Sequence, residues 1–444
     1  MNYHIFEEVI LLLTLAVLAI AVLKRFNIAP ILAYLIVGVI VSPYSLGLIS
    51  DNRDVRFIAE FGVVFLMFTV GLEFSMAKFM ALKKQVIGLG GAQVLITSLF
   101  AGAIDWFFSH DLIEAITIGG IIALSSTAIV IKQLAEQLEL NSRHGHLAIS
   151  ILIFQDIAVI PMLIMIAAFN SNDGFNMSVE ISSFLKAGVV LFLMLAIGRW
   201  ILRPLLREIA KVRSTELFTL TVLVVSLSAA CATHEAGFSL ALGAFIAGMM
   251  LSETEYRHQI EVEIRPFRDI LLGLFFITVG MLLDVRSLLP LLPWVFALTI
   301  TLVLAKTMII TVLSIAFGAP LGVALRTGLV LSQGGEFGFA LLTLALSSSI
   351  ISATAAQVVL SSLILSMMIA PWIIKNNGRW VKNLCPAHYA KNLHEIKMKI
   401  QHGSQDLHDH VIICGYGRIG QNISRFIEAE FQKYIALDLD AVRV

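Results

Sequence analysis

The amino-acid sequence predicts an all-α membrane protein of about 13 transmembrane helices with inverted repeats, followed by the start of a Rossmann-like α/β domain. Three observations indicate this fold class. Hydrophobic residues make up 58% of the 444 residues and charged residues only 14%, which is too apolar for an ordinary water-soluble protein. The apolar residues gather in runs long enough to cross a bilayer. A glycine-rich turn follows an apolar strand near the C-terminus. The net charge is zero, so no nucleic-acid partner is expected.

The apolar runs define the predicted membrane helices. The first run follows two glutamates and precedes no small-residue cleavage site, which is typical of a retained helix and not of a signal peptide. Basic residues gather in alternate loops, so the N-terminus is expected outside and the C-terminal segment in the cytoplasm. The predicted helices cover residues 5–23, 29–49, 57–74, 86–108, 113–132, 147–169, 184–204, 216–233, 237–251, 267–283, 288–317, 322–347 and 353–374.

The two halves of this membrane region repeat each other weakly. VVFLMFTVGLEF at residues 63–74 matches LGLFFITVGMLL at 272–283, and ALSST at 123–127 matches VLSQG at 330–334. The two offsets, 209 and 207 residues, keep nearly one register. Both pairs lie seven predicted helices apart, an odd number, so the halves cross the membrane in opposite directions. Inverted repeats of this kind are typical of secondary transporters, whose site lies between the halves near the midplane.

The fifth and twelfth predicted helices each contain residues that weaken a helix. Hydroxyl side chains cluster in Leu124–Thr127, and adjacent glycines lie within Ser332–Glu336. Hydroxyls compete for backbone hydrogen bonds and glycines add backbone freedom. Unwound backbone at membrane depth is tolerated only where it lines a cavity or packs in protein, so these corresponding positions indicate a binding site. Gln333 and Glu336 either orient the broken twelfth helix or have a purely structural role.

A carboxylate lies near the middle of the sixth predicted helix. Asp156 follows Gln155 within the apolar run 147–169. A charge at this depth costs about 2.5–3.5 kcal/mol on insertion scales, and it must face protein or water. Asp156 is either a structural acid paired with a base or a group that alternates between a proton and a cation, and the repeats and helix breaks favour the second. Because neutral Gln155 cannot carry a second proton, the exchange is expected to be electroneutral.

Lys306 is the second charge expected deep in the membrane, within the eleventh predicted helix. It lies too far from the helix ends to extend its amino group easily to the interface, so it is expected to face the protein core. Lys306 either neutralises Asp156 or the C-terminal ends of the discontinuous helices, or it only holds the structure together. Of these, we favour a role where the broken helices meet.

The sequence becomes polar after residue 375. Residues 1–375 are therefore the predicted transmembrane exchanger domain, 376–409 a cytoplasmic linker, and 410–444 the beginning of a nucleotide-binding domain. Histidines are scattered through the linker without metal-binding spacing, so no metal is expected beyond a transported monovalent cation. A complete domain of the last type needs about a hundred residues, and the chain is therefore expected to be truncated.

Residues 411–438 follow the order of the dinucleotide fingerprint. An apolar strand at 411–414 runs into glycines, an amphipathic helix follows, and a second strand at 434–437 ends at an acid. The glycines let the backbone approach a phosphate at the helix N-terminus, and the acid meets a ribose hydroxyl. AMP or NAD(H) is the expected regulatory ligand, and no catalytic cofactor is expected. The predicted contacts are Gly415, Tyr416, Gly417, Arg418, Ile419, Gly420, Asp438 and Asp440.

Six motifs along residues 60–440 together resemble the Kef-type glutathione-gated potassium efflux systems of the monovalent cation:proton antiporter-2 family. The resemblance implies a homodimeric K⁺/H⁺ antiporter of the sodium/proton antiporter fold with crossed broken helices. It also implies a bacterial inner membrane and potassium efflux coupled to proton entry. The motifs are FGVVFLMFTVGLEF, ALSSTAIVIKQL, LIFQDIAVIP, EIRPFRDILLGLFFITVGM, LSQGGEFGF and CGYGRIGQ.

The same resemblance implies roles for individual residues and partners. Gln155 and Asp156 correspond to the family's Gln-Asp pair, and the hydroxyls of Ser125, Ser126 and Thr127 are the implied further cation ligands. A cytoplasmic domain, glutathione or a glutathione adduct, and an ancillary cytoplasmic subunit are the implied regulators.

One position departs from the family pattern. Arg265 stands before the Pro-Phe pair, where the family usually has a glutamate. Glutathione gating is therefore less well supported than transport.

Two other functions fit part of the sequence. A ligand-gated potassium channel is suggested by the Thr-Val-Gly triplets at 69–71 and 278–280, but neither continues with Tyr-Gly and both lie within full-length apolar runs. A membrane oxidoreductase is suggested by the nucleotide fingerprint, but no second redox centre or haem-ligand histidine pair accompanies it in the predicted helices. The protein is therefore not expected to be an enzyme.

Overall fold

The described part of the chain is almost entirely helical. Every predicted membrane helix except that over 184–204 coincides with a described helix or with two consecutive ones, and most of 184–204 lies outside the described residues. The computed structural model describes residues 3–23, 25, 30–48, 53–73, 80, 82–140, 142–169, 189, 198, 200–202, 204–212, 214–236, 239–384, 410–415, 418–429 and 434–437.

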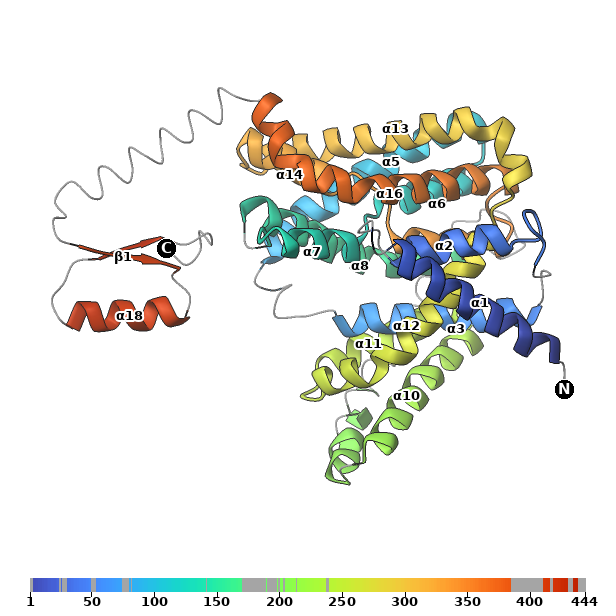
Figure 1. Ribbon diagram of the computed structural model, residues 1–444, viewed down its shortest axis with the longest axis horizontal. Coiled ribbons are helices and arrows are strands. Elements are labelled where there is room, and N and C mark those ends of the chain that lie inside the picture. The colour runs from blue at the N-terminus through green and yellow to red at the C-terminus, as the bar shows by residue number, and fades with distance from the viewer. Residues whose placement is uncertain are drawn as a thin grey trace.

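The helices labelled α1 to α16 form two groups, visible in Figure 1. In one group α3 packs against α11 and α12, and α2 packs against α1 and α12. Its members are α1 (Tyr3–Leu23), α2 (Pro30–Val41), α3 (Arg53–Glu73), α10 (Thr215–Glu235), α11 (Leu240–Ser252) and α12 (Arg257–Met281). In the other group α5 packs on α6, and α13 packs on α14 and α16. Its members are the π-helix η2 (Lys84–Gly90), α5 (Gly91–Ser109), α6 (Leu112–Ala123), α7 (Thr127–Glu136), α8 (Arg143–Phe169), α13 (Val285–Ala316), α14 (Leu321–Val330), α15 (Glu336–Ser347) and α16 (Ala353–Leu384).

Six helical segments of the described chain are long and apolar enough to cross a membrane, and shorter apolar helices lie between them. Two of the six are composite: η2 continues into α5, and α6 is followed after a short break by α7. The six are Lys84–Ser109, Leu112–Glu136, Arg143–Phe169, Thr215–Glu235, Val285–Ala316 and Ala353–Leu384.

Two helix ends differ from the sequence-based bounds for local reasons. α2 ends at Val41 because Pro43 disfavours helical backbone at the residue before it. The hydroxyl of Ser42 instead donates to the carbonyl of Met281, 2.9 Å away. α16 continues past residue 375 to Leu384 because its last turns are still packed, with Asn377 and Val381 buried.

The Thr-Val-Gly triplets lie within helices, where their glycines allow close packing. A β-carbon at Gly71 would lie 2.1 Å from the carbonyl oxygen of Phe245, so α3 and α11 meet backbone to backbone. A β-carbon at Gly280 would lie 2.3 Å from the carbonyl oxygen of Leu35, which brings α12 equally close to α2. Helical backbone does not present the row of carbonyls that a potassium filter needs, so the triplets give no support to the channel hypothesis.

The C-terminal unit consists of two strands and a helix. β1 (Val411–Cys414) and β2 (Tyr434–Leu437) are parallel, in the register Val411 to Tyr434 through Cys414 to Leu437, and α18 (Arg418–Ala429) connects them. The strands occupy the predicted residues. Parallel strands require a long crossover connection, usually a helix, because a tight turn cannot join them.

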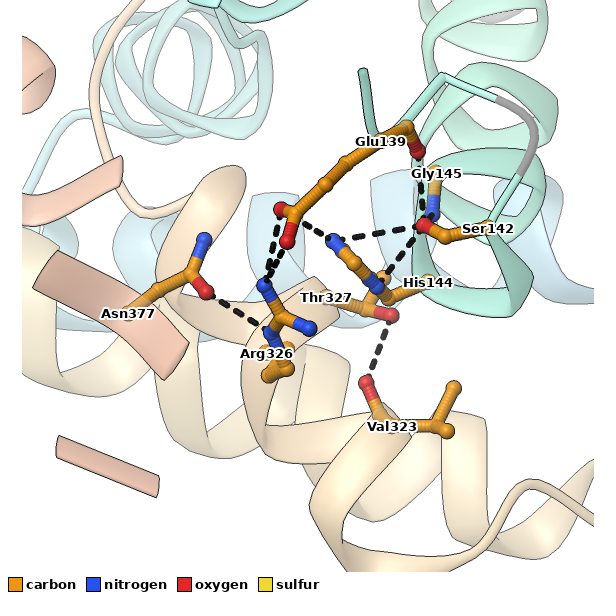
Figure 2. A network of polar contacts seen from close by, with 8 residues as sticks. All are labelled: Glu139, Ser142, His144, Gly145, Val323, Arg326, Thr327 and Asn377. Atoms are coloured by element: carbon orange, nitrogen blue, oxygen red, sulfur yellow. Dashed lines mark hydrogen bonds and ion pairs between the residues drawn. The ribbon is translucent and has the colours of Figure 1, made fainter. Parts of the chain in front are cut away.

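A polar network ties together the turn between α7 and α8, the helix α14 and the helix α16 (Figure 2). Both carboxylate oxygens of Glu139 accept from Nη2 of Arg326, at 2.6 and 2.7 Å, and Nε of Arg326 donates to Asn377, 2.7 Å away. The ring of His144 lies 3.1 Å from Glu139 and 2.9 Å from the hydroxyl of Ser142. These contacts hold the middle of α14 against the turn between α7 and α8 and against α16.

The acid of this network is strongly biased toward its ionised form. Partial burial alone would raise the pKa of the Glu139 carboxyl, but hydrogen bonds with His144 and Arg326, and the charge of Arg326, lower its pKa from the ordinary 4.5 to about 2. A carboxyl whose pKa is lower in the folded state stabilises the fold above its unfolded pKa. That stabilisation is lost as the pH falls from about 4.5 toward 2.

We predict that Glu139→Gln lowers the free energy of unfolding by about 2 kcal/mol at pH 7, a value discounted for the partial exposure of the pair. The difference from the wild type is expected to be constant above about pH 5 and to shrink below it. Thermal unfolding of the detergent-solubilised protein across this pH range measures both. The control is Glu136→Gln, which alters an exposed carboxylate 4.0 Å from Lys132. Equal losses in the two variants at pH 7 would contradict the prediction.

Candidate cation site at the crossing of two broken helices

Two helices of the second group are interrupted where the sequence predicts breaks. α6 ends at Ala123 and α7 begins at Thr127, while α14 ends at Val330 and α15 begins at Glu336. The intervening backbone is partly extended, as at Leu124 (φ −75°, ψ 149°). Because hydrocarbon offers no partners for the backbone groups freed at a break, protein atoms must supply them.

The two breaks touch each other. The hydroxyl of Ser125 donates to the carbonyl of Leu331, 2.9 Å away. A β-carbon at Gly335 would lie 2.7 Å from the carbonyl carbon of Ser125, so only glycine lets the second break approach the first this closely. The residues 124–126 and 331–335, although some 200 positions apart in the sequence, therefore form one crossing.

Lys306 joins the C-terminal ends of both interrupted helices. Its side chain is fully buried on α13, and its Nζ donates to the carbonyls of Leu124 (2.6 Å) and Gln333 (2.7 Å). A third hydrogen bond, 2.9 Å long, reaches the hydroxyl of Ser125. A cation is favourable at helix C-termini, where unpaired carbonyls carry partial negative charge.

Glu336 lies at the opposite, N-terminal ends. It is the first residue of α15, it is 4% exposed, and its Oε1 accepts from the backbone N–H of Ala128 in the first turn of α7, 3.3 Å away. An acid is favourable at helix N-termini. Lys306 and Glu336 thus counter the two kinds of helix end at the crossing. Gln333 is also buried, and its amide atoms have no hydrogen-bond partner within the described residues.

Asp156 lies on α8 beside the start of α7. The hydroxyl of Thr127 donates to Oδ1 of Asp156 at 3.2 Å. Asp156 and Thr127 are partly exposed, whereas the neighbouring residue Gln155 is buried. The carboxyl of Asp156 is therefore partly accessible and lies beside a hydroxyl at a helix break.

The other hydroxyls of the first break are engaged differently. Ser125 contacts Leu331, Lys306 and Gln155, and Ser126 caps α7 by accepting from the N–H of Ile129 at 3.2 Å. Of the three predicted hydroxyl ligands, Thr127 is therefore the one that contacts Asp156 in this conformation. Ser125 and Ser126 instead form hydrogen bonds with backbone groups at the helix breaks.

Gln155 is held on both sides, and one of its partners is a residue that the sequence reading did not select. Its Oε1 accepts from the backbone N–H of Ser125 at 2.8 Å, and its Nε2 donates to Oε1 of Gln93 at 2.8 Å. Gln93 lies on α5 and is fully buried. A neutral amide in the apolar run 86–108 was a signal for such a contact, since buried polar groups need partners.

The predicted nucleotide contacts are only partly described. Gly415 has φ of +100°, which favours glycine, and a β-carbon at Gly420 would lie 2.0 Å from the carbonyl oxygen of Gly415. Ile419 is exposed, and Arg418 begins α18. Tyr416, Gly417, Asp438 and Asp440 lie outside the described residues.

The sequence matches one protein family over most of its length, at residues 11–376: the sodium/hydrogen exchanger, transmembrane family. A putative K⁺ efflux antiporter KefB of Alkalimonas amylolytica is 42% identical over 450 residues, covering 98% of this chain and 66% of that protein. K⁺ efflux antiporter 1, chloroplastic, of Arabidopsis thaliana is 38% identical over 424 residues, covering 94% of this chain and 35% of that protein. The chain therefore spans only part of the length of these relatives.

A solved structure shares the fold. The sodium proton antiporter MjNhaP1 from Methanocaldococcus jannaschii at pH 8 superposes with a TM-score of 0.67 over 86% of this chain and 100% of that one, at 17% sequence identity. This confirms the predicted sodium/proton antiporter fold. The matched family and these relatives are transporters rather than enzymes.

We predict that Lys306→Met lowers the free energy of unfolding by about 2–3 kcal/mol, because it leaves buried carbonyls of both breaks without a donor. Lys306→Arg retains hydrogen-bond donors, so its free energy of unfolding is expected to fall less. Thermal unfolding in detergent measures the change, with Lys132→Met as control because Lys132 is exposed. A Lys306→Met protein as stable as the wild type would contradict the prediction. It would show that the free-energy cost of burying the amino group equals the free energy gained from its hydrogen bonds.

Proposed function

Because the chain belongs to the sodium/hydrogen exchanger family, we propose that it exchanges a monovalent cation for protons at Asp156. Potassium is the proposed cation, and its efflux is proposed to be coupled to proton entry. The observation that carries this proposal is the contact of Asp156 with Thr127, the residue at which α7 resumes after the break. Proton and cation then compete for one carboxylate, so binding of either releases the other.

The charges around the crossing support an electroneutral exchange. Lys306 donates its three hydrogen bonds to residues of the two breaks. Gln155 is neutral. Glu336 accepts from the N-terminus of α7. Asp156 is therefore the acid that we propose carries one proton or one cation per cycle. A carboxylate and a hydroxyl are suitable ligands for a partly dehydrated monovalent cation, with water completing the set.

The proposed cellular setting follows from the family resemblance and from the basic residues of alternate loops. We propose a homodimer in a bacterial inner membrane with the N-terminus outside, regulated through the C-terminal unit by AMP or NAD(H). Glutathione gating has weaker support, because Arg265 stands where the family usually has a glutamate. Arg265 is exposed on α12 and lies 3.8 Å from Glu261. An ancillary cytoplasmic subunit remains a proposal from the family resemblance.

We predict that Asp156→Asn abolishes cation-dependent proton movement, because asparagine neither releases a proton nor supplies a negative charge. The measurement uses purified protein in liposomes with an internal pH dye and an imposed potassium gradient. Glu136→Gln, which alters an exposed acid on α7, is expected to retain wild-type flux. Undiminished proton-coupled flux in Asp156→Asn would refute the proposal, and potassium flux without proton movement in the wild type would favour a channel.

We further predict that the chain binds AMP or NADH through the turn between β1 and α18. Gly420→Val is expected to remove binding, because its side chain would meet the carbonyl of Gly415 and displace the start of α18. Calorimetric titration of the purified chain with AMP and with NADH measures this, and Ile423→Ala, which changes an exposed position on α18, is the control. Binding that persists in Gly420→Val would place the ligand elsewhere.

A further inference from the structure

Gln93 makes three hydrogen bonds at the first helix break. Its Oε1 accepts from Nε2 of Gln155 at 2.8 Å. Its Nε2 donates to the carbonyl of Ala123, the last residue of α6, at 3.1 Å, and to the hydroxyl of Thr97 at 3.2 Å. The side chain is fully buried. Gln93 therefore reaches from α5 to both α6 and α8.

Backbone groups fix which way the side-chain amides of Gln93 and Gln155 are turned. The N–H of Ser125 can only donate, so Gln155 must turn its oxygen toward Ser125 and its nitrogen toward Gln93. The carbonyl of Ala123 can only accept, so Gln93 must turn its nitrogen toward Ala123 and its oxygen toward Gln155. Reversing either amide would face two donors or two acceptors against each other. The pair has one satisfied arrangement.

The pair also completes the hydrogen bonding of the break. The carbonyl of Ala123 and the N–H of Ser125 are groups that an uninterrupted helix would pair internally. The two glutamines supply both partners, and Lys306 supplies the partner of Leu124. The break is thus held from α5 and α8 on one side and from α13 on the other.

We propose that Gln93 is a positioning residue for cation exchange, which orients Gln155 and through it fixes the first break and the Thr127 hydroxyl that holds Asp156. In this arrangement Gln155 acts as part of the support and not as a cation ligand, because its oxygen is directed to Ser125. The inference rests on the proposed function and adds a residue on α5 to it. Loss of Gln93 removes one of the two donors to the Ala123 carbonyl, the other being Nε2 of Gln155 at 3.2 Å. It also removes the acceptor that orients the Gln155 amide. The break is then held less tightly, and Thr127 is less firmly positioned beside Asp156.

The first test compares Gln93→Met with Gln357→Met in liposomes. Gln357 is a matched control because its amide also bridges two backbone groups, Asp284 N–H and Leu282 carbonyl, at 3.0 and 2.6 Å. Gln93→Met is expected to raise the KM for potassium about tenfold, the effect of losing one well-formed hydrogen bond at the site, and to shift the pH profile of exchange. Gln357→Met is expected to lower the yield of folded protein and to leave KM and the pH profile unchanged.

The second test uses Gln93→Glu, which has the same shape. A protonated carboxyl can donate to Ala123 and accept from Gln155, whereas an ionised one faces the Ala123 carbonyl with a second acceptor. The titratable groups nearest this chain of contacts are Lys306, through Ser125, and Asp156, through Thr127. The KM of Gln93→Glu is expected to match the wild type at low pH and to rise with pH more steeply than in the wild type. Wild-type KM at every pH in both Gln93 variants would overturn the inference.

A readout independent of transport separates this inference from the proposed function. Hydrogen exchange of the peptide over residues 121–130, measured by mass spectrometry in detergent, is expected to quicken in Gln93→Met and not in Gln357→Met. If the wild type moves no protons with potassium, the proposed function fails. An unchanged hydrogen-exchange rate in Gln93→Met would then also refute the claim that Gln93 supports the break. If the wild type transports, and both the KM and the hydrogen-exchange rate are unchanged in Gln93→Met, the inference alone fails.

Discussion

The arrangement of the membrane helices depends on one constraint: a helix that stops inside hydrocarbon leaves backbone groups that only protein can pair. Here one amino group meets part of that demand at both breaks. Lys306 bonds a carbonyl of each break and the serine between them. Both interrupted helices are consequently held to α13 at a single point. The remaining polar groups of the crossing are arranged around this point.

A basic and an acidic side chain lie at opposite helix ends of the crossing. The amino group of Lys306 lies at two C-termini, and the carboxyl of Glu336 lies at the N-termini of α7 and α15. Asp156 lies beside this crossing, in contact with the Thr127 hydroxyl and partly exposed. A functional acid can change its protonation state without dismantling the fold when separate groups stabilise the helix ends.

Much of this arrangement could be predicted from the sequence, because several of its features are visible in short stretches of residues. Hydroxyl and glycine clusters mark both breaks, a lone acid in an apolar run marks Asp156, and matched motifs mark the inverted halves. The partners of buried polar groups were harder to predict. Gln93 meets Gln155 across 62 positions, and Glu139 meets Arg326 across 187. Residue type says that such groups need partners, but only the packing of helices decides which ones they meet.

The short π-helix η2 has a further consequence for the crossing. It immediately precedes α5, which carries Gln93 toward the first break. A π-helix accommodates an additional residue relative to an α-helix, and each residue of an α-helix advances the side-chain direction by about 100°. Ordinary helical winding over Lys84–Gly90 would therefore turn α5 about its axis and direct Gln93 away from Ala123. The π-helix η2 thus sets the rotation of α5 about its axis, so that Gln93 faces the break between α6 and α7.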